Sequence, residues 1–237
     1  MKKSIILSLI IFSTMLSYGQ LTVGVSAGSN LSSMTVSRRD LSTFKINPAF
    51  GINANLIADY KFNQNMSIWT GLSISQKGFN QHLKYYFRPG LDSTADMTSR
   101  LSYIELPIYL KFNTTIKQIN VFYGAGPYIA YGLSGKVTTN ITGRVNLTTV
   151  DKIKWDKSYD YKSDLLNTYG YSNIKRLDFG IGTILGFTYK HFMLTASYQY
   201  GLHNLMWEYF QNENMSNSSL SISVGYFIDN LITPRQL

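Results

Sequence analysis

Three features are scarce or missing in this sequence of 237 residues, and each absence excludes a class of protein. Cysteine is absent, which excludes disulfides and an anchor built on a lipidated cysteine. No segment after residue 19 holds the about 18 continuous apolar residues of a transmembrane helix. Charged residues make up only 15% of the chain, while tyrosine and glycine each occur 18 times. This composition is unusual for a soluble enzyme and favours pleated surfaces and membrane interfaces.

The first nineteen residues have the layout of an export signal. Lys2 and Lys3 precede an apolar run over residues 5–16, and the small residues Ser17 and Gly19 stand at the cleavage-like end. We therefore predict a signal peptide over residues 1–19, with a mature chain that begins near Gln20. The alternative is a buried N-terminal helix.

Alternation of apolar and small polar residues dominates the rest of the chain. Successive side chains on a strand point to opposite faces, so this period of two predicts strands. The bulky set of each run consists of Leu, Ile, Val, Phe and Tyr, and the opposite set is rich in Gly, Ser, Thr and Asn. The runs cover residues 21–31, 48–60, 66–77, 101–112, 121–134, 176–189, 192–202 and 218–228.

These runs predict an all-β fold, an eight-stranded antiparallel up-and-down transmembrane β-barrel over residues 20–228. Run lengths suit tilted strands that cross a bilayer in about 9–11 residues. The gaps alternate between tight (61–65, 113–120, 190–191) and wide (32–48, 78–100, 135–175, 203–217), as expected for short periplasmic turns and long extracellular loops. The oily set would face lipid, the small polar set would line the bore, and residues 229–237 would form a periplasmic tail.

Two other architectures are open at this point. Weak alternation over residues 136–149 allows ten strands, although we favour a hairpin there that extends the fifth and sixth strands beyond the membrane. A soluble sandwich or lipocalin-like barrel would also alternate, but its solvent face would carry Lys, Glu and Thr instead of Gly, Ser and Asn.

Several short motifs resemble the PorT-like outer-membrane β-barrel family of Bacteroidota. The stretch YIELPIYLKF at residues 103–112 is similar to a family strand that reads YLEIPLLLKY. Other similar features, in family order, are QKG at 76–78, GAGPY at 124–128, DFG at 178–180 and YGL at 200–202. The resemblance covers essentially the whole mature chain and implies an outer-membrane barrel. It also implies a link to secretion, because the family's namesake is associated with the type IX system.

Charged and aromatic side chains predicted to face the bore are the candidate site residues. Unpaired buried charges are costly, so we predict two ionic layers that plug the bore, Lys77–Asp178–Glu105 near the outer end and Asp59–Lys111 near the periplasmic end. The aromatic residues expected to fill the bore are Trp69, Tyr103, Tyr109 and Tyr128. Alternatives are an ion or proton path through the charges and a small hydrophobic-ligand pocket among the rings.

No motif predicts catalysis, a cofactor or a metal site. His203, with Glu208 in the following loop, is the one candidate base, but Ser197 lies about 20 Å along the strand, at about 3.3 Å per residue. His82 is expected in a loop and His191 in a periplasmic turn. The glycines at 180, 182 and 186 lack the G-x-G-x-x-G spacing of a nucleotide loop. We therefore expect a non-enzymatic protein with no catalytic residue, cofactor or metal ligand.

The formal net charge of +9 bears on partners. Basic residues gather in the wide gaps but are mixed there with aspartates, which disfavours a nucleic-acid partner. Contact with the phosphates of an outer-leaflet glycolipid such as lipopolysaccharide fits better, with plain solvation as the alternative. The leading functional hypothesis is a structural or accessory barrel that contacts secretion or envelope-assembly proteins. The alternatives are a narrow solute channel or ligand carrier, and a lipid-modifying enzyme.

Overall fold

The computed structural model describes residues 20–37, 44–86, 92–143, 146–155, 174–206 and 214–228. The predicted signal peptide and the predicted C-terminal tail lie outside these residues. In the part of the chain that is described, there is no helix long and apolar enough to cross a membrane.

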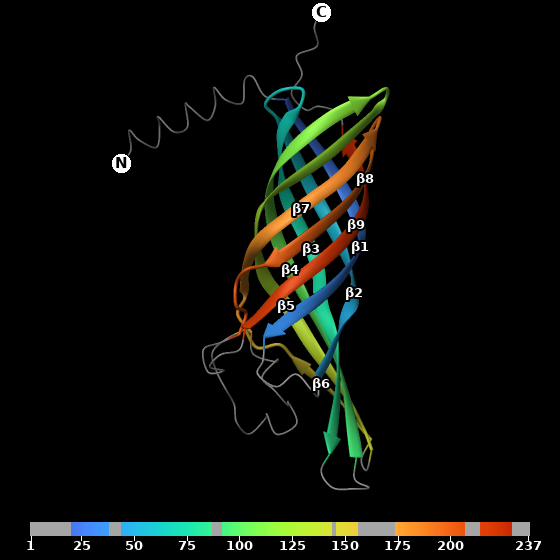
Figure 1. Ribbon diagram of the computed structural model, residues 1–237, viewed down its shortest axis with the longest axis vertical. Helices are drawn as coiled ribbons and strands as arrows, with labels where there is room; N and C mark the ends of the chain where they lie inside the picture. The colour runs from blue at the N-terminus through green and yellow to red at the C-terminus, as the bar shows by residue number, and fades with distance from the viewer. Residues whose placement is uncertain are drawn as a thin grey trace, which may run out of the picture.

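Nine antiparallel strands are described, and eight of them close into a ring. The strands are β1 (Gln20–Ser37), β2 (Phe44–Lys61), β3 (Met66–Tyr86), β4 (Asp92–Ile116), β5 (Ile119–Thr142), β6 (Leu147–Lys152), β7 (Leu177–Tyr189), β8 (Phe192–Gly201) and β9 (Asn214–Ile228). Each ring strand pairs with its sequence neighbours, and β1 pairs with β9 to close the barrel. Figure 1 shows these strands running obliquely around a common axis. The predicted eight-stranded up-and-down barrel is confirmed.

The ninth strand, β6, lies outside the ring. It pairs with the end of β5 over residues 136–141, further from the periplasmic end than the segment of β5 that pairs with β7. The predicted hairpin therefore forms, but its second arm is a separate strand and does not continue into β7. Ten strands around the barrel are ruled out among the described residues, because β6 contributes no further pairing to the ring.

Tight turns connect strands at one end of the barrel. Lys117 and Lys190 adopt positive φ values of 55° and 54° in two of these turns, as two-residue hairpins require. In the third turn, the Asn63 side chain accepts hydrogen bonds from the backbone of Asn65 and Met66. β1 begins at this end and β9 finishes there, since Gln20 pairs with Lys61 and Val23 with Ile228. By the rule for bacterial barrels, this end is periplasmic.

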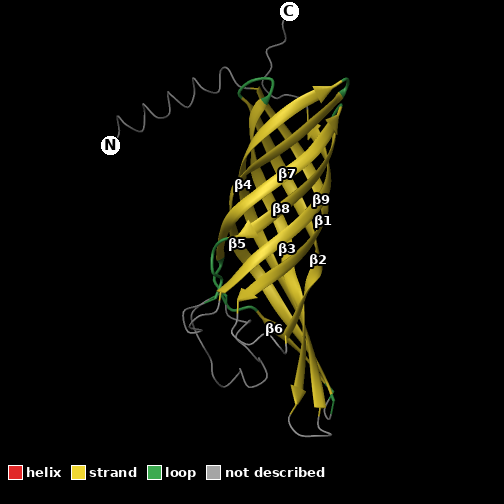
Figure 2. Cartoon of the chain, viewed as in Figure 1, coloured by secondary structure: helices red, strands yellow, loops and turns green. Residues whose placement is uncertain are grey.

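At the opposite end, the wide gaps contain more strand than we predicted. β3 and β4 pair continuously to Tyr86 and Asp92, and β4 and β5 pair to Thr94 and Thr142. Together with β6, these strands form a sheet that projects beyond the ring, at the lower end of Figures 1 and 2. We call this sheet, over residues 79–86, 92–100, 135–142 and 147–152, the outer projection. Residues 79–86 and 92–100 were expected to be loop, and that expectation is wrong. His82 consequently lies on β3.

The barrel's outer surface carries the bulky side chains, as predicted. Among them, Phe50, Ile52, Ile181 and Val224 are each more than half exposed. This exposed apolar belt extends over all eight ring strands, and it is the surface that a hydrocarbon environment requires. A water-soluble sandwich or lipocalin would place these side chains inside.

The bore is less polar than we predicted. One apolar cluster, around Trp69, Phe122 and Met193, fills the inner half. A second, around Leu101, Val137 and Met206, extends from the outer half into the projection. A layer of asparagine and serine lies between them. The predicted small polar set thus lines only part of the bore, and large side chains fill the rest, as an interior just wide enough for side chains allows.

Candidate functional site

The inner end of the bore contains a buried ion pair next to two aromatic rings. Lys111 on β4 places its Nζ atom 2.5 Å from Asp59 Oδ2 on β2, and both residues are almost entirely buried. The same ammonium lies 4.9 Å from the ring centroid of Trp69 and 4.5 Å from that of Phe122. The two rings stack on each other, 5.6 Å apart. The structure thus brings the predicted pair together and adds Phe122, which we did not single out.

A second ion pair lies further out. Lys77 on β3 places Nζ 2.8 Å from Glu105 Oε1 on β4, and their side chains are 1% and 4% exposed. The Lys77 ammonium lies over the rings of Tyr128 and Tyr103, at 4.9 and 5.6 Å. It also donates a hydrogen bond to Gln199 Oε1 at 3.1 Å.

Asp178 belongs to this level of the bore but does not complete the predicted three-residue ionic layer. Asn217 Nδ2 donates to Asp178 Oδ2 at 2.9 Å, and the Tyr128 hydroxyl donates to the same atom at 3.5 Å. Between these described residues, Asp178 and Lys77 form no ion pair within 4.0 Å. Asp178 is stabilised by neutral donors, and it bridges β7 to β5 and β9.

All four predicted bore-filling aromatic residues are buried. Tyr103, Tyr128, Tyr109 and Trp69 are 0%, 2%, 3% and 5% exposed. Tyr109 also joins the polar network, because Gln199 Nε2 donates to its hydroxyl at 3.3 Å. These rings thus close the bore around the two lysines.

A small polar cavity of about 70 Å³ lies between the two ion pairs. Its walls include Ser26, Asn53, Asn55, Ser223 and Glu105. Asn55 donates to Ser26 at 2.9 Å, and Ser223 donates to Asn53 at 2.8 Å. A polar space of this size holds a few water molecules, and it is much smaller than the about 300–1,000 Å³ of ordinary ligand sites.

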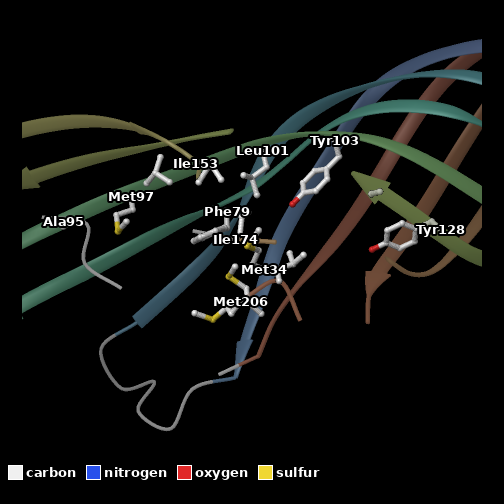
Figure 3. Packing of buried hydrophobic residues seen from close by; sticks show 14 residues of the cluster. Met34, Phe79, Ala95, Met97, Leu101, Tyr103, Tyr128, Ile153, Ile174 and Met206 are labelled. Carbon is white, nitrogen blue, oxygen red and sulfur yellow. The ribbon is translucent and has the colours of Figure 1, made fainter. Parts of the chain in front are cut away.

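An apolar cap covers the outer mouth, and the sequence did not reveal it. Figure 3 shows Phe79 and Met97 of the projection, and Leu101 at its base, facing Met34, Ile153, Ile174 and Met206. Trp155 packs edge-on against Tyr103 at 6.0 Å and lies where a Cβ atom on Gly132 would be. The segments 153–155, 174–176 and 203–206 supply Ile153, Trp155, Ile174, Leu205 and Met206 of this cap. They are irregular, so no period of two marks them, whereas the alternation around Val137 and Ile141 could have indicated those two members of the cap.

The residues considered for catalysis are not assembled into a site. His203 stacks on Phe179 with ring centroids 4.9 Å apart, and Ser197 lines the central cavity. Glu208 lies outside the described residues. His191, in the turn between β7 and β8, stacks on Tyr226 of β9. His82 pairs with Asp96 at 2.6 Å on the projection. Within the described segments, no group of three or more His, Asp or Glu residues could hold a metal ion.

Several solved structures are similar to this chain. Neisserial surface protein A shares 14% identity over 86% of this chain and 96% of its own, with a TM-score of 0.39. OprG of Pseudomonas aeruginosa shares 13% over 88% and 96%, with a TM-score of 0.41. Ail of Yersinia pestis shares 12% over 88% and 99%, with a TM-score of 0.38. At these scores the likeness carries no inference about function.

No curated protein is similar enough to the sequence to count as a match. The family model of the outer membrane protein beta-barrel domain matches residues 14–206, which is most of the chain. The closed ring and its exposed apolar belt agree with that description. The chain therefore belongs to the outer membrane protein beta-barrel domain family and is a protein of the bacterial outer membrane.

Proposed function

We propose that this protein is a non-catalytic outer-membrane barrel that acts as a structural or accessory component. The observation that carries the proposal is the filled bore. Two buried lysine–carboxylate pairs, each next to two aromatic rings, and two apolar clusters occupy the bore at successive levels. A barrel filled in this way anchors whatever it presents at its two ends. The barrel wall then serves to hold the outer projection at the cell surface.

A conductance measurement tests the closed bore. We expect the protein in a planar bilayer to give no more current than a protein-free bilayer. The double variant Trp69→Ala, Phe122→Ala, which removes the two rings next to Lys111, should give measurable openings and so show that insertion is detectable. A steady current through the unaltered protein would reject the plug. It would favour a narrow solute channel or an ion path through Lys77 and Lys111.

We further propose that the protein works with secretion or envelope-assembly proteins. Two observations support this role. The stretch at residues 103–112 and the shorter motifs resemble the PorT-like family of Bacteroidota, and the outer projection offers a polar sheet surface beyond the lipid. On that surface Thr98 lies opposite Thr138, and Asp96 lies opposite Asn140.

Co-purification from native outer membrane in mild detergent tests this role. We expect secretion or assembly proteins to accompany the barrel. The variant Thr98→Glu, Asn140→Glu should lose them if the projection makes the contact. The matched variant Thr114→Glu, Thr115→Glu places the same charges at the exposed periplasmic end of β4 and should retain them. A barrel that purifies alone under all conditions would contradict the accessory role.

A ligand carrier is less well supported, because the cavity inside the bore is about 70 Å³ and the outer cluster is filled by its own side chains. A lipid-modifying enzyme would need a base and nucleophile in contact. Among the described residues, His203 and Ser197 do not supply such a pair. Mass analysis of lipid A from a deletion strain would reveal this activity if it exists.

A further inference from the structure

Three cationic side chains lie side by side on the outer surface of the projection. Arg100 on β4 pairs directly with Lys136 on β5, and Lys136 pairs directly with Lys152 on β6. All three residues are exposed. Directly opposed residues on neighbouring strands share a face, with Cβ atoms about 4.5–5.5 Å apart. We call Arg100, Lys136 and Lys152 the cationic row.

The positive charge of this row is not neutralised by the part of the chain that is described. Like charges directly opposite one another are destabilising, and none of the three residues has an ion pair there. The nearest candidate acids are engaged or face elsewhere. Asp96 pairs with His82, and Asp151 lies opposite the buried Val137, on the inner face of the hairpin. An anion from outside the chain would remove the repulsion.

The row lies where the barrel's outer surface changes from apolar to polar. On the barrel side of the row, Ile104, Tyr131 and Leu177 are paired in register across β4, β5 and β7. Tyr131 and Leu177 are 47% and 42% exposed. Arg100 lies four residues beyond Ile104, about 13 Å along a strand, or about 10 Å along the membrane normal for a tilt of about 40°. This places the row at the level of lipid headgroups.

A fourth cation lies at the level of Tyr131, on the barrel side of the row, next to two aromatic rings. The exposed Arg176 lies 5.6 Å from the ring centroid of Tyr131 and 5.7 Å from that of Trp155. Its backbone carbonyl accepts a hydrogen bond from Gly132 N, which fixes it next to β5. The guanidinium of an arginine carries several N–H donors in one plane, the geometry that suits phosphate oxygens.

We propose that the cationic row, together with Arg176, binds the phosphate groups of a phosphorylated glycolipid in the outer leaflet. Phosphate carries enough charge to neutralise several adjacent cations. A lipid fits better than a soluble anion, because the apolar side chains directly below the row would contact its acyl chains. This inference does not depend on the proposed accessory role, since a barrel of any function could carry such a site.

A binding measurement on the full chain in detergent micelles tests the site. The probes are lipid A, the same lipid with its phosphates removed, and inorganic phosphate. The test variant is Arg100→Gln, Lys136→Gln, Lys152→Gln. The matched control, Lys61→Gln, Lys117→Asn, Lys190→Asn, removes the same charge at the periplasmic end, with asparagine at the two positive-φ positions because it tolerates that backbone.

We expect the test variant to bind lipid A about tenfold or more weakly than the unaltered protein, because three charge-assisted contacts are lost. The control variant should stay within about twofold, and dephosphorylated lipid should bind the unaltered protein as weakly as lipid A binds the test variant. Equal losses in the two variants would overturn the site. Equal binding of the dephosphorylated lipid would overturn phosphate recognition, and equal binding of inorganic phosphate would overturn the choice of a lipid.

Folding of each variant is checked by its heat-dependent electrophoretic mobility. Because the row is exposed and mutually repelling, its removal should leave the barrel folded. If the triple variant fails to fold, the single variant Arg100→Gln carries the test. A loss of less than about twofold in lipid A binding by the folded single variant would then count against the proposal, since Arg100 would lose its charge-assisted contact.

Discussion

Lys77 and Lys111 are almost entirely buried, and their surroundings are alike. Each ammonium contacts one carboxylate and lies over two aromatic rings, Glu105 with Tyr103 and Tyr128 in one case and Asp59 with Trp69 and Phe122 in the other. Burying a charge without a partner is costly, and a single carboxylate satisfies only part of an ammonium. The ring faces supply further attraction at desolvated sites. The carboxylates and the aromatic rings of the bore therefore stabilise the buried lysines together.

This coupling leads to a prediction for Lys77. Lys77→Met should lower the free energy of unfolding by about 3–5 kcal/mol, because it leaves Glu105 as an uncompensated buried charge. The double variant Lys77→Met, Glu105→Leu should recover most of that loss, because no buried charge remains. Urea unfolding in lipid bilayers, followed by tryptophan fluorescence, measures both. Lys136→Met, on the exposed surface, should change stability by less than about 0.5 kcal/mol. A double variant no more stable than the single one would contradict this account.

Sequence alone predicted which side chains enter the bore and which lysine meets which carboxylate, but not their other contacts. Parity along a strand fixes the face of each residue, so Lys77, Glu105, Asp59 and Lys111 could be assigned to the interior. Contacts across the bore depend on strand tilt and stagger. Those quantities come from the pairing of all eight strands. For that reason the contacts of Lys111 with Phe122 and of Asp178 with Asn217 were not predictable from the runs alone.

The apolar side chains of a strand face outward in the membrane and inward in the outer projection. Within the apolar belt, β4 turns Leu106, Ile108 and Leu110 outward, whereas in the projection it turns Asp96 and Thr98 outward and Ala95 and Met97 inward. The projection is thus built as a water-exposed sheet that is apolar on its inner face. A search for outward-facing oily residues could not find these strand segments, and this inversion explains why residues 79–86 and 92–100 were expected to be loop.

The register of the projection can be tested with an introduced disulfide, because the chain has no cysteine of its own. Thr98 and Thr138 are directly opposed, so cysteines at both positions should lie about 5 Å apart between Cα atoms, within disulfide range. We expect this pair to cross-link on mild oxidation of whole cells, as seen by a mobility shift that reductant reverses. The pair Thr98→Cys, Thr142→Cys shares the face but is four residues out of register, and it should remain reduced. Similar cross-linking of both pairs would indicate flexible loops.

As a whole, the molecule is one closed sheet that is in contact with lipid over the barrel and with water over the projection. The ring gives every strand a neighbour on both sides, which satisfies its backbone in hydrocarbon, while the apolar clusters of the bore and the cap close the interior at both ends. Figures 1 and 2 show both parts along one axis, the barrel and the sheet that extends from it. Side chains such as Leu185, which is 58% exposed on β7, are therefore stable only if lipid surrounds them.

Leu185 provides the test of that environment. It lies five residues from the turn at Lys190, about 16 Å along a strand, which places it near the middle of an apolar band about 25 Å tall. Leu185→Lys should therefore destabilise the folded barrel by about 2–4 kcal/mol, measured by urea unfolding in bilayers. Thr138→Lys, outward-facing on the projection, should have an effect within about 0.5 kcal/mol. In a water-soluble barrel both residues would be solvent-exposed and both changes nearly neutral. Equal, small effects at the two positions would thus contradict a membrane-embedded belt, whatever the strand order.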